Sequence, residues 1–245
     1  MRPSELVKMF DLEDTYWWFV ARRELVCELL LQYGAAQADI AILDVGCGTG
    51  ATLKAIDDLG TAFGVDRSPE ALRLCQMRGL SRLARARAET LPVTSSSVDV
   101  VLALDLLEHI QDDSAAAREF ARVLRPGGVL LVTVPACPEL WSEHDEALDH
   151  LRRYRGARLR RILLEAGLRI QKLSPVITAL LLPIAALRLA QRILPKKRGA
   201  PETAFIIPPK PVNWLLTEIL RLERVWLRRF KLPVGVSLVA VARRP

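Results

Sequence analysis

The sequence is poor in cysteine, with four in 245 residues. Cys27, Cys47, Cys75 and Cys137 form no C-x-x-C pair and no spacing typical of zinc ligands. This pattern excludes a disulfide-stapled miniprotein and indicates free thiols in a reducing compartment. We therefore expect a cytoplasmic protein without a zinc framework.

Long apolar runs are also missing. The uncharged segment 176–187 contains twelve residues and is broken by Pro183, whereas a transmembrane helix needs about 20 apolar residues. The first residues of the chain carry Arg2, Glu5 and Lys8 and lack the apolar core of a signal peptide. The sequence thus predicts neither a lone transmembrane helix nor secretion.

Hydrophobic residues nevertheless make up 51% of the chain, enough to bury one sizeable core. This content excludes intrinsic disorder and favours one domain with an insertion. The net charge of +7 is distributed unevenly. Residues 1–150 contain 14 Lys and Arg against 24 Asp and Glu, whereas residues 151–233 contain 19 against 4. The positive charge is therefore concentrated in residues 151–233, and only this segment favours an anionic partner.

Short apolar strands alternate with helical segments along the chain. The expected strands are 40–45, 61–65, 82–88, 98–104, 129–134, 168–173 and 236–242. Helices are expected at 49–59, 69–77, 113–124 and 156–166. Because parallel strands need long crossovers, this alternation predicts an α/β protein with a doubly wound, mostly parallel seven-stranded sheet.

This alternation divides the chain into four segments. Residues 1–39 are expected to form an N-terminal helical lid, and residues 40–173 the ligand-binding core. Residues 174–233 are too long for an ordinary connection and predict a helical insertion before the last strand. Residues 234–245 return to the core as its final strand.

The insertion contains 11 basic and 3 acidic residues. Its second half, 214–230, places an apolar side that includes two tryptophans opposite Arg221, Arg224 and Arg228. Two interpretations remain open for this segment. One is a helix lying in a membrane interface, and the other is an amphipathic helix packed on the sheet with a solvated basic face.

A strand at 42–45 runs into a glycine-rich loop, residues 46–50, that opens a helix. Such a turn lets backbone N–H groups approach a ligand near the positive end of the helix dipole. The glycine spacing also fits a dinucleotide fingerprint, with Asp66 about twenty residues on as a ribose partner. Asp44 favours another ligand, because a carboxylate there would repel a pyrophosphate and attract a cation.

Residues 43–50, Leu-Asp-Val-Gly-Cys-Gly-Thr-Gly, resemble the first motif of the class I S-adenosylmethionine-dependent methyltransferases. Further segments similar to this family follow in order at 64–70, 91–101 and 124–128. Residues 106–110, Leu-Leu-Glu-His-Ile, extend the resemblance to the ubiquinone-biosynthesis-like members. The resemblance implies a Rossmann-like fold and S-adenosyl-L-methionine as the cofactor.

The same resemblance implies which residues hold the cofactor. Asp66 would hold the ribose hydroxyls. Relatives often carry an Asp for the adenine amino group at the position of Arg87, so that Glu89 or backbone groups would make this contact here. The expected cofactor-binding residues are Asp44, Gly46, Cys47, Gly48, Gly50, Asp66, Arg67, Glu89 and Asp105.

The three histidines, His109, His144 and His150, follow the fourth or fifth expected strand, on the side where open parallel sheets bind ligands. His144 is the first candidate for contacting the acceptor or its proton, and His109 and Asp105 are further catalytic candidates. The alternative is that His144 hydrogen-bonds loop backbone. Asp105, Glu108 and His109 also resemble an E-x-x-E-H metal set of some relatives, but Asp has a shorter reach, and we assign no metal.

Together these features predict an enzyme that transfers a methyl group from S-adenosylmethionine to a small-molecule or lipid-linked acceptor. The basic apolar insertion would form the acceptor pocket and touch the anionic inner face of a membrane, giving a peripherally associated cytoplasmic protein. Three alternatives remain. One is an RNA methyltransferase, although no RNA-binding motif is present and nucleic acid is not the expected partner. The second is a non-catalytic scaffold that binds S-adenosylmethionine. The third is an NAD-dependent oxidoreductase, which the glycine spacing also fits.

Overall fold

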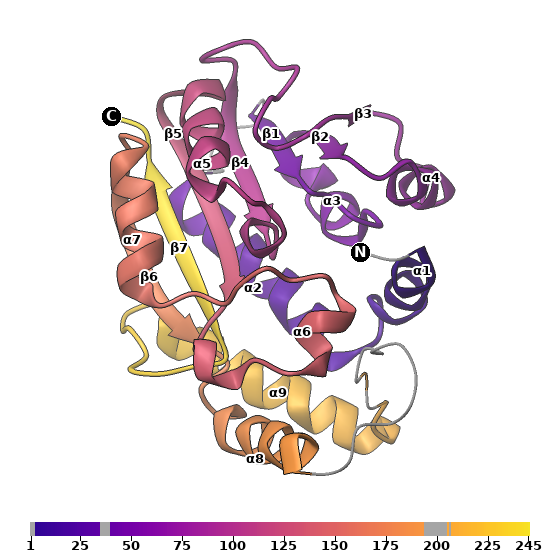
Figure 1. Cartoon of the computed structure of the whole chain (residues 1–245). Helices are drawn as coiled ribbons and strands as arrows, with labels where there is room; N and C mark the ends of the chain where they lie inside the picture. Colours follow the sequence, from indigo (N-terminus) through magenta and orange to yellow (C-terminus); the bar gives the residue numbers. More distant parts are fainter. Residues whose placement is uncertain (1–2, 35–39, 194–204, 206) are drawn as a thin grey trace.

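The computed structural model describes residues 3–34, 40–193, 205 and 207–245. Within them, one seven-stranded sheet runs in the order β3-β2-β1-β4-β5-β7-β6 (Figure 1). Strands β1 to β5 are parallel, and β7 lies antiparallel between β5 and β6. The strands are β1 Ala41–Val45, β2 Thr61–Asp66, β3 Leu83–Arg85, β4 Val98–Leu104, β5 Leu124–Pro135, β6 Arg169–Val176 and β7 Ser237–Arg243.

Two of the described helices precede the first strand, and the others lie between successive strands. They are α1 Pro3–Leu12, α2 Trp17–Tyr33, α3 Ala51–Ala55, α4 Pro69–Met77, α5 Asp113–Val123, α6 Glu143–Ala147, α7 Gly156–Glu165, α8 Leu181–Ile193 and α9 Lys210–Leu227. The expected Rossmann-like architecture, mostly parallel with a helical segment before the last strand, is thereby confirmed.

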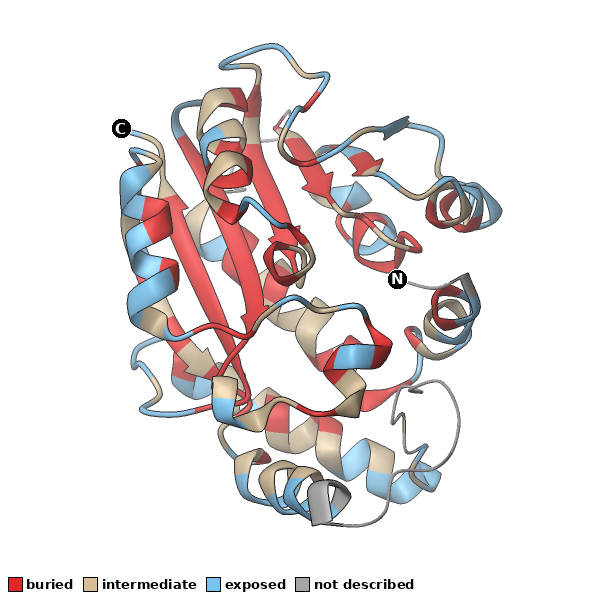
Figure 2. Ribbon diagram, in the orientation of Figure 1, coloured by how far each residue is buried: buried red, intermediate tan, exposed pale blue. Residues whose placement is uncertain are grey.

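Side chains of the central strands alternate between two apolar layers. On β4, Val100 and Leu102 pack into the layer that α2, α3 and α9 cover. Val101 and Ala103 pack into the opposite layer, beneath α5 and α7. Strands buried on both faces need the continuous apolar runs that the sequence shows, and Figure 2 shows the sheet as the buried centre of the molecule.

The sheet places its ligand-binding edge between β1 and β4. Strand β1 pairs with β2 on one side and with β4 on the other, so the strand order reverses there. In open α/β sheets, such a reversal leaves a crevice outside the carboxyl ends of the strands. The loops after β1, β2, β4 and β5 all lie at this edge.

Strands β3, β5 and β6 differ clearly in length from their expected ranges. Strand β3 covers only Leu83–Arg85 of the expected 82–88. Strand β5 begins at Leu124 rather than at residue 129, because its early residues pair with the start of β4 across a register shift. Strand β6 continues to Val176 through Pro175, so the insertion begins after residue 176 and not at 174. A proline is tolerated there because β6 is an edge strand.

Helix α9 packs against α2 and the core, with Leu220 and Leu227 buried. Arg221 and Arg224 bind Glu24 of α2, and Arg228 binds Glu28. The segment is thus a helix packed on the protein, as one of the two interpretations has it, but its arginines are paired with glutamates of α2 and only Arg228 is more than half exposed. Among the helices that the structure describes, none combines the length and hydropathy of a membrane span.

The N-terminal helices are tied to the glycine-rich loop through Glu13. Its buried carboxylate accepts hydrogen bonds from the Thr49 hydroxyl and from Arg78 Nη2, the latter at 2.7 Å. Arg78 also binds Asp14, at 2.9 Å. The segment that joins α1 to α2 is thus held against the loop that follows β1.

The backbones of Gly235 and Val176 approach each other closely where β7 begins. A Cβ atom on Gly235 would lie 2.2 Å from the Val176 oxygen. We expect Gly235→Ala to lower the free energy of unfolding by about 1–3 kcal/mol in urea denaturation, because backbone atoms cannot move aside cheaply. Gly156→Ala is the control, since its Cβ would meet only Leu173, at 4.0 Å. Equal unfolding midpoints for the two variants would contradict this assignment.

Candidate active site

A cavity of about 1250 Å³ opens at the carboxyl ends of the parallel strands. Pockets for one drug-sized ligand usually measure about 300–1,000 Å³, so this cavity has room for two ligands. Its walls come from the glycine-rich loop, the ends of β2 and β4, the α1–α2 region, the loop around α6, and helix α8. All nine expected cofactor-binding residues except Gly50 line it.

The glycine-rich loop forms one wall with backbone atoms. Gly46, Gly48 and Gly50 have φ values of 74°, 55° and 84°, in the left-handed region that favours glycine. A Cβ on Gly46 would lie 2.7 Å from Leu106, and one on Gly50 would lie 2.6 Å from Leu80. A Cβ on Gly48 would meet no atom within 4 Å. Gly46 and Gly50 therefore serve close packing, whereas Gly48 leaves space on the cavity side for a ligand.

Cys47 lies in the same loop but is sequestered. Its sulfur is buried 3.9 Å from Cys75 Sγ, and burial with this contact holds the thiol pKa well above its ordinary value. A thiol without accessible thiolate is a poor nucleophile, so the side chain fills space beside the loop.

Asp66 ends β2 with both carboxylate oxygens facing backbone donors. Oδ2 accepts the N–H of Gly48 at 3.1 Å, and Oδ1 accepts the N–H of Ser68 at 2.8 Å. Burial raises its pKa, and these two hydrogen bonds oppose the shift. The carboxylate is thereby oriented at the cavity wall, where its remaining lone pairs can accept hydrogen bonds from ligand hydroxyls.

Asp44 is buried at the end of β1 beneath this loop, with 2% of its surface exposed. Desolvation raises its pKa to about 7, Arg22 opposes the shift, and Asp66 adds to it. Because burial disfavours a lone charge, a cationic ligand would stabilise the ionised form. The carboxylate is therefore suited to select a cation.

Arg22 of α2 is a site residue that the sequence analysis missed. Its Nη1 binds the Asp105 carboxylate, and its buried Nε has no hydrogen-bond partner among the described residues. Asp105, with φ of 49°, also accepts a hydrogen bond from the Thr133 hydroxyl at 3.0 Å. The orphaned donor at the cavity wall fits a ligand carboxylate. A lone arginine at the start of a helix gives no local signal for this role.

Arg67 and Glu89 line the outer part of the cavity. Glu89 binds Arg87 at 2.9 Å, which helps to lower its pKa against the opposing effect of burial. The Arg67 carbonyl accepts a hydrogen bond from Arg85 Nε at 3.1 Å. Both residues line the same cavity as Asp66.

Asp145 organises the opposite end of the cavity. Its buried carboxylate accepts hydrogen bonds from Arg153 Nη1 at 2.9 Å and from Arg188 Nη1 at 3.3 Å, and it lies 3.0 Å from His150 Nδ1. These charges and hydrogen bonds hold the Asp145 pKa far below its usual range, against the cost of burial. An ionised Asp145 can only accept, so His150 Nδ1 donates the proton of this hydrogen bond, and Nε2 lies on the other side of the ring, 4.0 Å from Glu108 Oε1.

The other two histidines, His144 and His109, are half-buried. His144, the first sequence candidate, packs edge-on to Phe205 with ring centroids 5.7 Å apart, and desolvation lowers its pKa to about 4. His109 lies 4.8 Å from the His150 ring, and burial lowers its pKa to about 3. Both are neutral at pH 7 and are weaker bases than a free imidazole.

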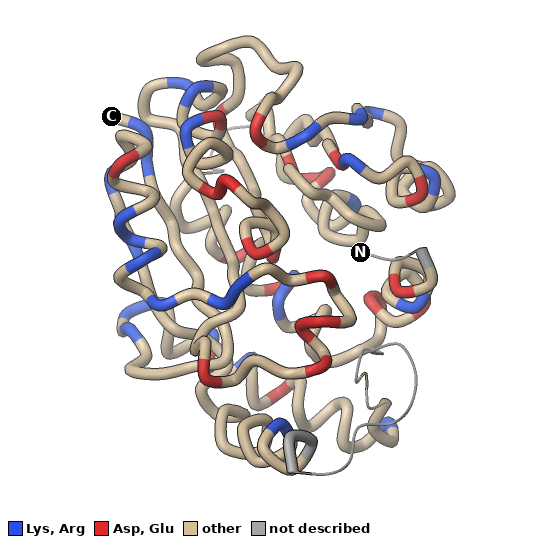
Figure 3. The backbone as a smooth tube through the Cα atoms, in the orientation of Figure 1, with Lys and Arg blue, Asp and Glu red and all other residues tan. Residues whose placement is uncertain are grey.

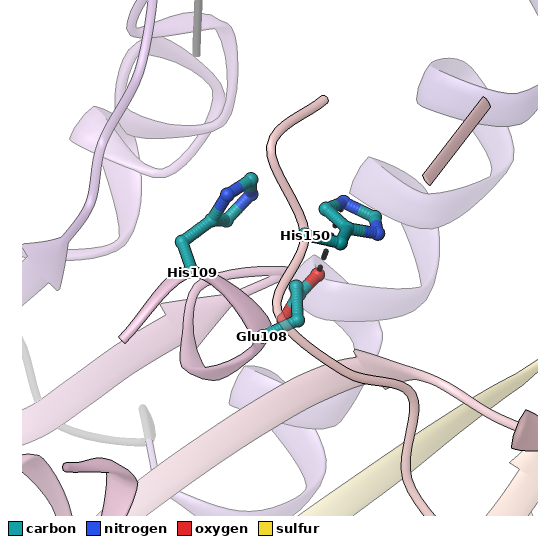
Figure 4. Close-up of side chains that lie close together, drawn as sticks. All are labelled: Glu108, His109 and His150. Carbon is teal, nitrogen blue, oxygen red and sulfur yellow. Dashed lines mark ion pairs between the residues drawn. The ribbon is translucent and has the colours of Figure 1, made fainter. Parts of the chain in front are cut away.

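Glu108, His109 and His150 offer ligand atoms that lie within 4.8 Å of one another (Figure 4). The Glu108 carboxyl is fully buried, without hydrogen-bond partners among the described residues, and lies 4.0 Å from His150 Nε2. Burial and nearby Asp105 raise its pKa well above the ordinary value. The cluster therefore differs from the D-x-x-E-H set of the sequence. Asp105 binds Arg22 instead, and His150 is the third member of the cluster.

Comparison with known proteins agrees with this geometry. Residues 43–132 match the methyltransferase domain family. The core of the chain is a class I S-adenosylmethionine-dependent methyltransferase domain. Its cofactor is S-adenosylmethionine, which fits the open space at Gly48, the buried acid at Asp44 and the oriented carboxylate of Asp66.

Two curated relatives match the methyltransferase domain and its flanks. The chain is 32% identical over 144 residues to a ubiquinone biosynthesis O-methyltransferase of Xanthomonas oryzae, covering 53% of this chain and 60% of the relative. It is 31% identical over 163 residues to a protein of Mycolicibacterium smegmatis described as a probable S-adenosylmethionine-dependent methyltransferase, covering 65% and 62%. The matched region thus spans about three fifths of each relative.

Solved structures share the fold at lower identity. A S-adenosylmethionine-dependent methyltransferase from Thermotoga maritima superposes with a TM-score of 0.62 over 99% of this chain and 96% of that one, at 16% identity. A second one, from Archaeoglobus fulgidus, gives 0.57 over 91% and 94%, at 17% identity. At these identities the likeness concerns the fold.

Cofactor binding to the methyltransferase domain should depend on the protonation of Asp44. Because its pKa is about 7 in the free protein and a cation favours the ionised form, we expect the S-adenosylmethionine dissociation constant to fall about tenfold from pH 6 to pH 8. Isothermal titration calorimetry at both values measures it. Asp44→Asn should bind weakly with most of this pH dependence removed. An equally steep profile in that variant would assign the effect to another group, such as Asp66.

The same substitution should stabilise the cofactor-free domain. A carboxyl whose pKa rises from 3.8 to about 7 on folding contributes stability below the lower value, and this contribution is lost as the pH rises through 7. Asp44→Asn should therefore unfold like the wild type near pH 4 and exceed it at pH 8, by up to about 4 kcal/mol. Urea denaturation at the two pH values tests this, and a variant less stable at pH 8 would contradict it.

Proposed function

We propose that this protein transfers the methyl group of S-adenosylmethionine to a small-molecule or lipid-linked acceptor of apolar character. The observation that carries the proposal is a single cavity that joins the cofactor residues to the Asp145–His150 end. Methyl transfer needs the acceptor atom in line with the donor and shielded from water. A continuous cavity of this size supports both requirements.

The acceptor end supports an apolar ligand. Aromatic side chains cluster on its wall, with Phe205 centred 5.7 Å from Tyr16, Phe19 and His144. The nearby cations Arg153 and Arg188 bind Asp145, so their charge is shared with that carboxylate. An aromatic wall whose arginines are both engaged by a carboxylate favours a flat or apolar acceptor over a polyanion.

S-adenosylmethionine supplies an activated methyl group on a sulfonium. The chain itself binds and aligns: the loop at Gly48 receives the cofactor, Asp66 orients its ribose, and Arg22 meets its carboxylate. For a hydroxyl acceptor, His150 Nε2 takes the proton, and Asp145 stabilises the imidazolium that forms. This role passes from His144, the sequence candidate, to the histidine that a carboxylate orients.

Labelled cofactor incubated with lipid, soluble and nucleic-acid fractions of a cell extract tests the activity. We expect transfer into the lipid or soluble fraction, and loss of transfer in Asp66→Ala, whose carboxylate is lost from the cavity wall. Label in RNA would support the RNA alternative. Binding of cofactor without transfer to any fraction would support the scaffold.

His150 and His144 can be separated by substitution. We expect His150→Asn to lower kcat by about 10²–10⁴-fold for a hydroxyl acceptor, with the KM for S-adenosylmethionine unchanged, because general-base catalysis is lost while the cofactor site stays intact. His144→Asn is the matched control and should mainly raise the KM for the acceptor through its contact with Phe205. A larger loss of kcat in His144→Asn would return the role of base to that residue.

A further inference from the structure

Helix α9 is apolar on two sides. It buries one apolar stripe against the core through Leu220 and Leu227. Its arginines pair with Glu24 and Glu28 of α2 beside that stripe. Its outward face carries large apolar side chains, with Leu222 72% exposed and Trp226 56% exposed. A surface helix in water normally buries its apolar stripe and exposes its charges. The exposed apolar side chains of α9 form a second stripe that the protein itself leaves uncovered.

Helix α8 repeats this arrangement. Arg188 turns inward and donates hydrogen bonds to the Leu140 carbonyl and to Asp145, while Leu182 is 80% exposed and Leu189 57% exposed. Figure 3 draws most of α8 without charge colour, and Figure 2 shows exposed turns of α8 and α9 at the lower end of the molecule. Two successive helices thus expose apolar side chains at the edge of the sheet that holds the cavity.

The residues that flank these exposed apolar side chains indicate which partner the surface fits. Trp214, 63% exposed, and Trp226 are suited to the headgroup level of a bilayer. Lys210 begins α9, and Arg229 and Lys231 follow its end; all three are exposed. Basic residues flanking an apolar helix face with tryptophans are typical of helices that lie in an anionic membrane interface.

The acids of α9 do not oppose such an interface. Glu218 binds Arg221, and the Glu223 carboxylate accepts hydrogen bonds from the backbone N–H groups of Thr178 and Ala179 at 2.8 and 3.1 Å. Glu218 is thus paired with a cation and Glu223 is turned toward backbone donors, while Lys210, Arg229 and Lys231 are exposed cations of the same region.

We propose that the α8–α9 face docks on the surface of an anionic lipid bilayer. The face comprises Leu182, Leu189, Trp214, Leu215, Leu222, Val225, Trp226 and Phe230. The same two helices line the cavity through Ile184, Leu187 and Leu216, so an apolar ligand leaving the bilayer would reach the cavity along them. Docking itself is independent of the proposed methyl transfer.

Vesicle co-sedimentation of the full chain tests docking without any activity. Binding should be clear with vesicles in which about a third of the lipid is phosphatidylglycerol, and much weaker with phosphatidylcholine alone. The double variant Leu222→Gln/Trp226→Gln should bind at least about tenfold more weakly. Replacing Lys210, Arg229 and Lys231 by Gln should weaken binding to the anionic vesicles by about fivefold per charge.

The matched control is Met77→Gln/Leu164→Gln, which removes two exposed apolar side chains from α4 and α7. It should bind vesicles as the wild type does. Because all these positions are exposed, circular dichroism and melting should be unchanged, which separates docking from folding. Wild-type protein that ignores anionic vesicles, or a Leu222→Gln/Trp226→Gln variant that binds them equally well, would overturn the proposal. A wild-type dimer that this variant converts to a monomer would instead assign the face to a second copy.

Discussion

Removal of water from ionisable groups is the constraint on which the cavity depends. Asp44 and Glu108 have raised pKa values and His109 and His144 lowered ones, with burial as the largest cause in each case. Each group is thereby shifted toward its neutral form, since a lone charge is costly away from water. A ligand that brings a complementary charge, such as the cationic cofactor near Asp44, lowers the free-energy cost of the buried charge.

Two networks of paired charges line this cavity. At the cofactor end, Arg22 and Asp105 join α2 to the end of β4. At the other end, ionised Asp145 gathers Arg153, Arg188 and His150 from the segments after β5 and from α8. Paired charges of this kind orient side chains more than they stabilise a fold. Here they fix the orientation of Arg22 and His150, both of which line the cavity.

The N-terminal helices and α9 lie outside the segment that matches the methyltransferase domain family. Glu13 links the N-terminal helices to the glycine-rich loop, and Glu24 and Glu28 link α2 to α9. The N-terminal helices are therefore linked both to the glycine-rich loop and to α9. On α9, this pairing lies between a buried apolar stripe at Leu220 and Leu227 and an exposed one at Leu222 and Trp226.

The sequence by itself determined what local chemistry controls. Strand β4 and helix α4 have their expected bounds, because a continuous apolar run and the cap at Ser68, whose Oγ accepts the Ala71 N–H at 3.3 Å, are local signals. The glycine loop, Asp44 and Asp66 were likewise readable as a motif. Tertiary structure alone decided where β5 begins and where β6 ends, because both limits depend on pairing with neighbouring strands. It also decided which histidine contacts Asp145 and which side of α9 faces α2. Helical periodicity separates two faces of a helix, but only the partner helix, with its glutamates, selects the face that is buried.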